Sequence, residues 1–264
     1  MLALLLRHLL RMEGPGERDL GRLAVVAGAA LAFATVAIPL QLKNQWITIG
    51  WALEGAALTW LYPRVPHRGL LYAAYALLGA VFVRLALNPS IFVYEPHGMR
   101  VFNWYLYTYL ICAVAMLLAA SWLSSAEEPV RTIGLLQPAT LLASTGVILL
   151  FILLNIEIAD FYATGPEIMF RVGVSLAQDL TYTIGWLAFA LGLLTAGIWL
   201  HSRATRVTAV ALTAVTTFKA FLYDLGSLGG LYRVASLVGL AVSLALVAVA
   251  LQKFVLQAPK EASV

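Results

Sequence analysis

Long apolar segments, separated by short polar turns, run through almost the whole sequence. A helix of roughly 20 apolar residues spans a bilayer, whereas each strand of an outer-membrane barrel has about 10 residues. The segments match the helical length. Only 11% of the residues are charged, against about 25% in a soluble domain, so lipid must solvate most of the surface. The sequence therefore predicts an all-α fold, a polytopic membrane helix bundle.

We expect about eight transmembrane helices of this length, with Gly, Pro and Asn residues marking the turns between them. The predicted spans are Leu23–Leu42, Trp46–Tyr62, Gly69–Asn88, Phe102–Leu123, Ile133–Ile156, Gly173–Leu200, Arg206–Leu225 and Leu231–Leu256. Residues 1–22 are expected to form a cytoplasmic or interfacial N-terminal segment, and residues 258–264 a cytoplasmic tail.

Basic residues indicate how the spans are oriented. Of the 17 Lys and Arg residues, eleven fall on the side of both termini, three on the opposite side and three within spans. Because basic residues concentrate in cytoplasmic loops, we expect both termini in the cytoplasm. No Lys/Arg cluster with interleaved aromatic residues is present, which argues against nucleic acid as a partner.

A short motif occurs twice. The tetrapeptide Thr48–Trp51 (TIGW) recurs as Thr183–Trp186, and each copy lies in a span predicted to run from outside to inside. The next span in each case carries a cation near its outer end, Arg84 in the first and Lys219 in the second.

This order of shared features predicts an internal repeat of two four-helix membrane units, residues 23–125 and 131–257. Four helices are an even number, so the units would have the same orientation, as parallel repeats do. Chance similarity between apolar segments of restricted composition is the alternative.

Several stretches give the chain a resemblance to a known family. They are Gln45–Ala56 (QWITIGWALEGA), Phe102–Tyr109 (FNWYLYTY), Lys219–Leu225 (KAFLYDL) and Gly230–Ser236 (GLYRVAS). The chain resembles the C-terminal region of a bacterial family of polytopic membrane proteins classed as a domain of unknown function. Members of that family are longer, so this chain is expected to correspond to their last third. The resemblance implies a membrane fold and a bacterial inner-membrane location, and it implies no activity.

Charged residues inside the spans are the first candidates for a site. A charge at the bilayer centre is unfavourable by roughly 2.5–3.5 kcal/mol on insertion scales, so it needs a partner or water. Glu54 lies about 12 Å in from Trp46, and Arg84 about 6 Å from the outer end of the next span, at ~1.5 Å per residue. An arginine side chain spans that difference, which predicts a Glu54–Arg84 ion pair.

Other polar residues fall at a similar level, in the outer half of the predicted bundle. They are Asn103, Glu157, Asp160, Asp179, Lys219, Asp224 and Arg233. One interpretation is a polar cavity open to the periplasm that binds an anionic or sugar-containing small ligand. Its candidate ligand-binding residues are Glu54, Arg84, Asn103, Asp179, Lys219, Asp224 and Arg233. The other interpretation is a set of interhelical salt bridges that fix packing, such as Glu54–Arg84 and Asp224–Arg233.

Three functions therefore remain open. A transporter or ligand-binding protein would use the polar cavity, and a scaffold or assembly subunit would bind a membrane-protein partner without a small-molecule site. An envelope transferase with a lipid-linked donor would use Glu157 and Asp160 as base or metal ligands. No catalytic motif, phosphate loop or dinucleotide fingerprint is present. The single cysteine, Cys112, and four dispersed histidines predict no disulfide, metal site or cofactor, and the lipid bilayer is the one partner that composition requires.

Overall fold

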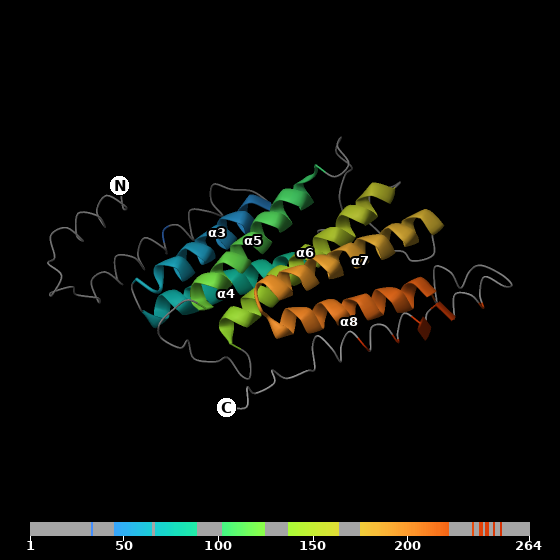
Figure 1. The fold of residues 1–264 in the computed structure, drawn as a ribbon. Coiled ribbons are helices and arrows are strands. Elements are labelled where there is room, and N and C mark those ends of the chain that lie inside the picture. The colour runs from blue at the N-terminus through green and yellow to red at the C-terminus, as the bar shows by residue number, and fades with distance from the viewer. Residues whose placement is uncertain are drawn as a thin grey trace, which may run out of the picture. The chain divides into compact units, whose positions relative to one another are not determined.

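The computed structural model describes residues 45–64, 67–88, 102–124, 137–163 and 175–221, together with isolated positions elsewhere. Every regular element in these ranges is a helix, and none of their residues lies in a strand (Figure 1). The helices are α3 (Gln45–Leu61), α4 (Arg68–Ala86), α5 (Trp104–Ser124), α6 (Pro138–Tyr162), α7 (Leu176–Trp199) and α8 (Arg203–Lys219). The predicted all-helical fold class is confirmed.

Six of the predicted spans correspond to these helices, α3 to α8. The first and last predicted spans, residues 23–42 and 231–256, lie outside the described residues except for isolated positions. In the described part of the chain, four helices are long and apolar enough to cross a membrane. They are Arg68–Ala86, Trp104–Ser124, Pro138–Tyr162 and Ala177–Trp199. Helices α3 and α8 are shorter, with 17 residues each.

Helix α6 differs most from its predicted span, Ile133–Ile156. It begins at Pro138, after an extended Gln137 (φ −71°, ψ 138°), because proline lacks an N–H and fits the first helical turn. It continues to Tyr162, where the N–H of Ala163 bonds to the carbonyl oxygen of Asp160. The last two turns therefore hold the polar residues that hydropathy alone places after the span.

The chain divides into two compact units, Met1–Ile168 and Met169–Val264. The first contains α3 to α6 and the second contains α7 and α8. In the first unit, α5 packs against both α3 and α6, and α3 also packs against α4. The predicted repeat units, residues 23–125 and 131–257, divide the chain at a different place and stay a prediction.

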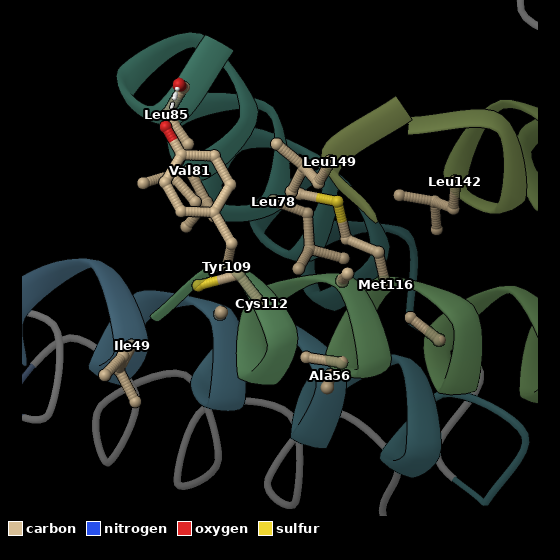
Figure 2. Close-up of a cluster of buried hydrophobic side chains, with 14 of the residues drawn as sticks. Ile49, Ala56, Leu78, Val81, Leu85, Tyr109, Cys112, Met116, Leu142 and Leu149 are labelled. Carbon is tan, nitrogen blue, oxygen red and sulfur yellow. Dashed lines mark hydrogen bonds between the residues drawn. The ribbon is translucent and has the colours of Figure 1, made fainter. Parts of the chain in front are cut away.

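Helix α5 is central to the core of the first unit. Its residues Tyr105, Tyr109, Cys112 and Met116 are completely buried, at the three- and four-residue spacing of one helix face. Figure 2 shows Tyr109 and Met116 pointing from α5 toward α4 and α6. The Tyr109 hydroxyl donates to the carbonyl oxygen of Leu85, 2.7 Å away. That carbonyl is in the last turn of α4, where main-chain oxygens lack helical partners.

Small residues let the helices of this unit approach closely, as membrane helices often do. Ala52 and Ala56 of α3 are buried. A Cβ added at Gly55 would lie 2.7 Å from Cγ of Leu78 on α4, and one at Gly146 of α6 would lie 3.1 Å from a main-chain oxygen of α5. At Gly55 the contact exists only because a side chain is absent, and at Gly146 a side chain would crowd α5.

The described part of the second unit is a hairpin of α7 and α8, which pack against each other. The turn between them passes through His201, whose φ of 52° lies in the left-handed region of backbone conformation. Ser202 then starts α8, and its hydroxyl accepts a hydrogen bond from the N–H of Thr205. At the other end of α7, the Ser175 hydroxyl accepts from the N–H of Gln178. Both helices thus begin at a serine N-cap, the preferred residue type there.

Candidate functional site

A polar cluster joins the start of α5 to the end of α6. The Asn103 side-chain nitrogen, Nδ2, donates to Oδ2 of Asp160 at 3.0 Å and to Oε2 of Glu157 at 3.4 Å. Asn103 itself is buried, with 6% of its surface exposed, while the two acidic residues are half-buried. We call Asn103, Glu157 and Asp160 the α5–α6 polar cluster.

Local structure explains why these three residues meet. Asn103 is the N-cap of α5, and its Oδ1 accepts a hydrogen bond from the N–H of Leu106 at 3.0 Å. Glu157 and Asp160 are three residues apart in α6, so they lie on the same helix face. The start of a helix carries a partial positive charge, which stabilises the two carboxylates placed beside it.

The hydrogen-bond capacity of the cluster is not used up by its own members. Glu157 Oε1 is shielded from solvent and has no hydrogen-bond donor within the described ranges. A carboxylate has about four acceptor positions, and a buried one without a donor is destabilising. The cluster can therefore accept hydrogen bonds from a further group, such as a hydroxyl.

Aromatic rings surround the start of α5. Trp104 stacks on Tyr105 with ring centroids 4.1 Å apart. Trp46, from the start of α3, stacks on Tyr107 at 5.9 Å, and half of its surface is exposed. The second contact also shows that the starts of α3 and α5 lie at the same end of this unit. Rings of this kind carry apolar faces that pack against a ligand or lipid.

A second polar contact joins α7 to α8. The Lys219 ammonium donates to the main-chain oxygen of Asp179 at 3.0 Å and to the Thr183 hydroxyl at 2.9 Å. Asp179 is buried at 9% exposure. Thr183 is the first residue of the second copy of the tetrapeptide. Lys219 is the cation that lies near the outer end of the span that follows this copy. The structure thus brings two matched features of the sequence repeat into direct contact.

The remaining predicted site residues have different outcomes. Glu54 on α3 and Arg84 on α4 are both half-buried on helices that pack together, and each takes part in a polar or electrostatic interaction. Their proposed ion pair stays a prediction. Asp224 and Arg233 lie outside the described residues, so no site geometry includes them.

The meeting of Asn103 with Glu157 and Asp160 was missed by sequence reasoning. The sequence did place all three at one level, and it offered the two acidic residues only as a base or metal ligands. Their spacing of three, combined with antiparallel neighbouring spans, was the available signal. Within the described part of the chain, no group of three or more His, Cys, Asp or Glu residues is arranged to hold a metal ion.

Comparison with known proteins identifies the chain at family level. Residues 1–171 and residues 68–254 match a family described as Predicted membrane protein (DUF2339). No curated protein and no solved structure matches the chain. The predicted resemblance to a membrane family classed as a domain of unknown function is confirmed, and the apolar helices agree with it. The chain is a multi-pass membrane protein and belongs to the DUF2339 family of predicted membrane proteins.

Proposed function

We propose that the protein is a transporter-like component of the bacterial inner membrane that binds a sugar-containing ligand at the periplasmic ends of α5 and α6. The observation that carries this proposal is the α5–α6 polar cluster, two carboxylates that share one buried amide. Such a cluster inside an apolar helix pair is unfavourable unless its acceptors are used. Binding of a hydroxyl-bearing ligand would use them.

The orientation in this proposal rests on the basic residues. Both termini are cytoplasmic because eleven of the 17 Lys and Arg residues lie on that side of the predicted spans. The start of α5 and the end of α6 then face the periplasm.

Charge favours the sugar-containing ligand over an anionic one. Two carboxylates repel a negatively charged group at close range, whereas carboxylate and amide groups form hydrogen bonds with hydroxyls. Lys219, one of the cations expected to hold an anion, already donates to two oxygens of α7. Exposed aromatic surface at Trp46 and the half-buried Trp104 ring offers faces for the apolar side of a sugar ring.

A thermal-shift experiment with defined probes tests this function. Purified protein is heated with neutral mono- and disaccharides and, separately, with the corresponding sugar phosphates. We expect a neutral saccharide to raise Tm, and the E157Q/D160N variant to lose that increase. The matched control is Asn155→Leu, which removes a polar group two residues before Glu157 on the same helix. Stabilisation by sugar phosphates alone, or an increase that survives in E157Q/D160N, would contradict the proposal.

A scaffold without a small-molecule site is the second candidate. It is favoured by Lys219, whose ammonium is bound by α7 of the same hairpin and therefore contributes to packing. In that role the chain would copurify with a membrane-protein partner in mild detergent, and substitutions in the α5–α6 polar cluster would leave the partner bound. The transferase alternative uses Glu157 and Asp160 and would lose all function in E157Q/D160N.

A further inference from the structure

The turn between α7 and α8 combines exposed apolar side chains with basic ones. Trp199 is 82% exposed and the next residue, Leu200, is 74% exposed. His201 and Arg203 follow and are exposed as well. Such a surface is amphipathic over a few residues, which is the character of side chains that lie at a membrane–water interface.

The charge of this turn is entirely positive. Arg203 and Arg206 lie in the first turn of α8, which has no acidic residue. No Asp or Glu occurs anywhere in residues 180–223. Cations at the start of a helix add to the partial positive charge of the helix end and are unfavourable there. An anion from outside the hairpin would relieve this repulsion.

Arg206 is held in a defined position. A Cβ added at Gly197 would lie 2.8 Å from Cγ of Arg206 and 3.0 Å from its main-chain nitrogen, so the stem of the arginine packs across the glycine. Its Nε is shielded and has no hydrogen-bond acceptor in the described part of the chain. The stem of the side chain is thus packed against α7, and residues 180–223 contain no carboxylate to pair with its charge.

We propose that the α7–α8 turn binds the phosphate-bearing headgroup of an anionic phospholipid. Arg203 and Arg206 would contact the phosphate, since a guanidinium group can donate two parallel hydrogen bonds to phosphate oxygens. Trp199 and Leu200 would enter the boundary between headgroups and acyl chains. A lipid is favoured over a soluble anion because it alone covers the charged and the apolar part of the turn together.

The turn between α3 and α4 repeats this combination. The Arg64 guanidinium lies 3.7 Å from the centre of the Trp60 ring, and its Nη1 donates to the Trp60 carbonyl oxygen at 2.6 Å. Arg64 is exposed, and no Asp or Glu occurs in residues 55–94. The combination of basic and aromatic side chains in a turn between helices therefore occurs in each of the two units.

Lipid binding can be measured on the intact protein. The probes are nanodiscs of phosphatidylcholine with and without phosphatidylglycerol, and bound phosphatidylglycerol is counted by native mass spectrometry. We expect R203Q and R206Q each to weaken phosphatidylglycerol binding roughly fivefold, the equivalent of about 1 kcal/mol per basic residue near an anionic surface. The control is R100Q, which removes a cation from the predicted outer loop and should have no effect.

Two further variants separate the site from general charge. Gly197→Ala leaves the net charge unchanged but displaces Arg206, so it should weaken binding as R206Q does. R203K/R206K keeps the charge and should retain part of the affinity, and circular dichroism verifies that each variant is folded. Equal binding by wild type, R203Q and R206Q would overturn the proposal. Equivalent binding of inorganic phosphate by the protein in phosphatidylcholine discs would also overturn it, because it would indicate an adventitious anion site.

Discussion

Asn103 illustrates how one side chain can serve a helix and a site together. Its oxygen caps α5 through the N–H of Leu106, and its nitrogen donates to the carboxylates of Glu157 and Asp160. An aspartate at this position could still accept the capping hydrogen bond, but when ionised it has no donor for the two carboxylates. Alanine has neither a side-chain acceptor nor a donor. The chemistry of an amide is therefore needed at this position.

Substitution of Asn103 tests this double role. N103A should lower the free energy of unfolding by about 1–3 kcal/mol, from the lost cap and from the lost donor to two carboxylates. N103D should keep the cap but add a third carboxylate, so it should also destabilise the protein. Denaturant titration in detergent measures both. In the E157Q/D160N background N103D should be tolerated better, and an unchanged effect there would argue against charge repulsion in the cluster.

The contact between Lys219 and Thr183 allows a double-mutant cycle. K219M and T183V each remove one partner of the 2.9 Å hydrogen bond. Groups in direct contact show coupling energies of about 0.5–3 kcal/mol, and we expect a value in that range. Additive effects in thermal unfolding would mean that the hydrogen bond does not stabilise the hairpin.

The sequence was sufficient to identify polar residues at a similar depth in the predicted bundle, but it did not identify the hydrogen-bond partners of each one. Glu157 and Asp160 count against a membrane span in hydropathy, so the predicted span ended at Ile156 although the helix continues. Their contact with Asn103 depends on how α5 and α6 pack against each other. The spacing of three residues shows that Glu157 and Asp160 share a helix face, but it does not show which residue of the neighbouring helix that face meets.

At the scale of helices, glycine positions determine how closely neighbours pack. A Cβ at Gly55 would lie closer to α4 than real Cβ atoms do, and one at Gly146 would be crowded by α5, whereas Gly79 and Gly192 have open space around them. Gly192 and Ala196 of α7 have the four-residue spacing of small residues at packed membrane helices, yet a Cβ added at Gly192 would meet no atom within 4 Å. Sequence spacing therefore predicts which residues share a face but not which face meets a neighbour.

Gly55 and Gly79 form a matched pair for substitution. Gly55→Ala should destabilise the protein by about 1–3 kcal/mol, because the new methyl group overlaps the buried Leu78 and overpacks the core. Gly79→Ala should be neutral or stabilising by up to about 1 kcal/mol, since alanine favours a helix more than glycine. Thermal unfolding in one detergent compares the two variants. Equal effects would contradict the close packing of α3 against α4.

The hydrogen bond at the end of α4 gives a prediction for the core. Tyr109→Phe keeps the buried ring and removes only the hydroxyl that donates to the Leu85 carbonyl. We expect a loss of roughly 0.5–1.5 kcal/mol in the free energy of unfolding. Hydrogen exchange should rise in the last turn of α4 and stay constant in α6. A uniform rise in both helices would instead indicate general loosening of the core.

Across the whole molecule, the apolar composition and the lengths of the spans were enough to predict a helical membrane protein, and the resemblance of several stretches indicated its family. The basic residues predicted that both termini are cytoplasmic. The repeated tetrapeptide predicted that Lys219 in the second repeat unit is the counterpart of Arg84 in the first. Individual contacts within each unit required the structure. The central claim is that the α5–α6 polar cluster is reachable from the periplasm.

Cysteine labelling in intact spheroplasts tests that claim most directly. Cys112, which is buried, is replaced by alanine, and single cysteines are placed at position 157, at position 160 and, as a control, at the completely buried Met116. A membrane-impermeant thiol reagent is then added from outside. We predict labelling at 157 and 160 and protection at 116. Protection of both cluster positions in folded protein would show that the cluster is sealed, and would contradict a periplasmic ligand site.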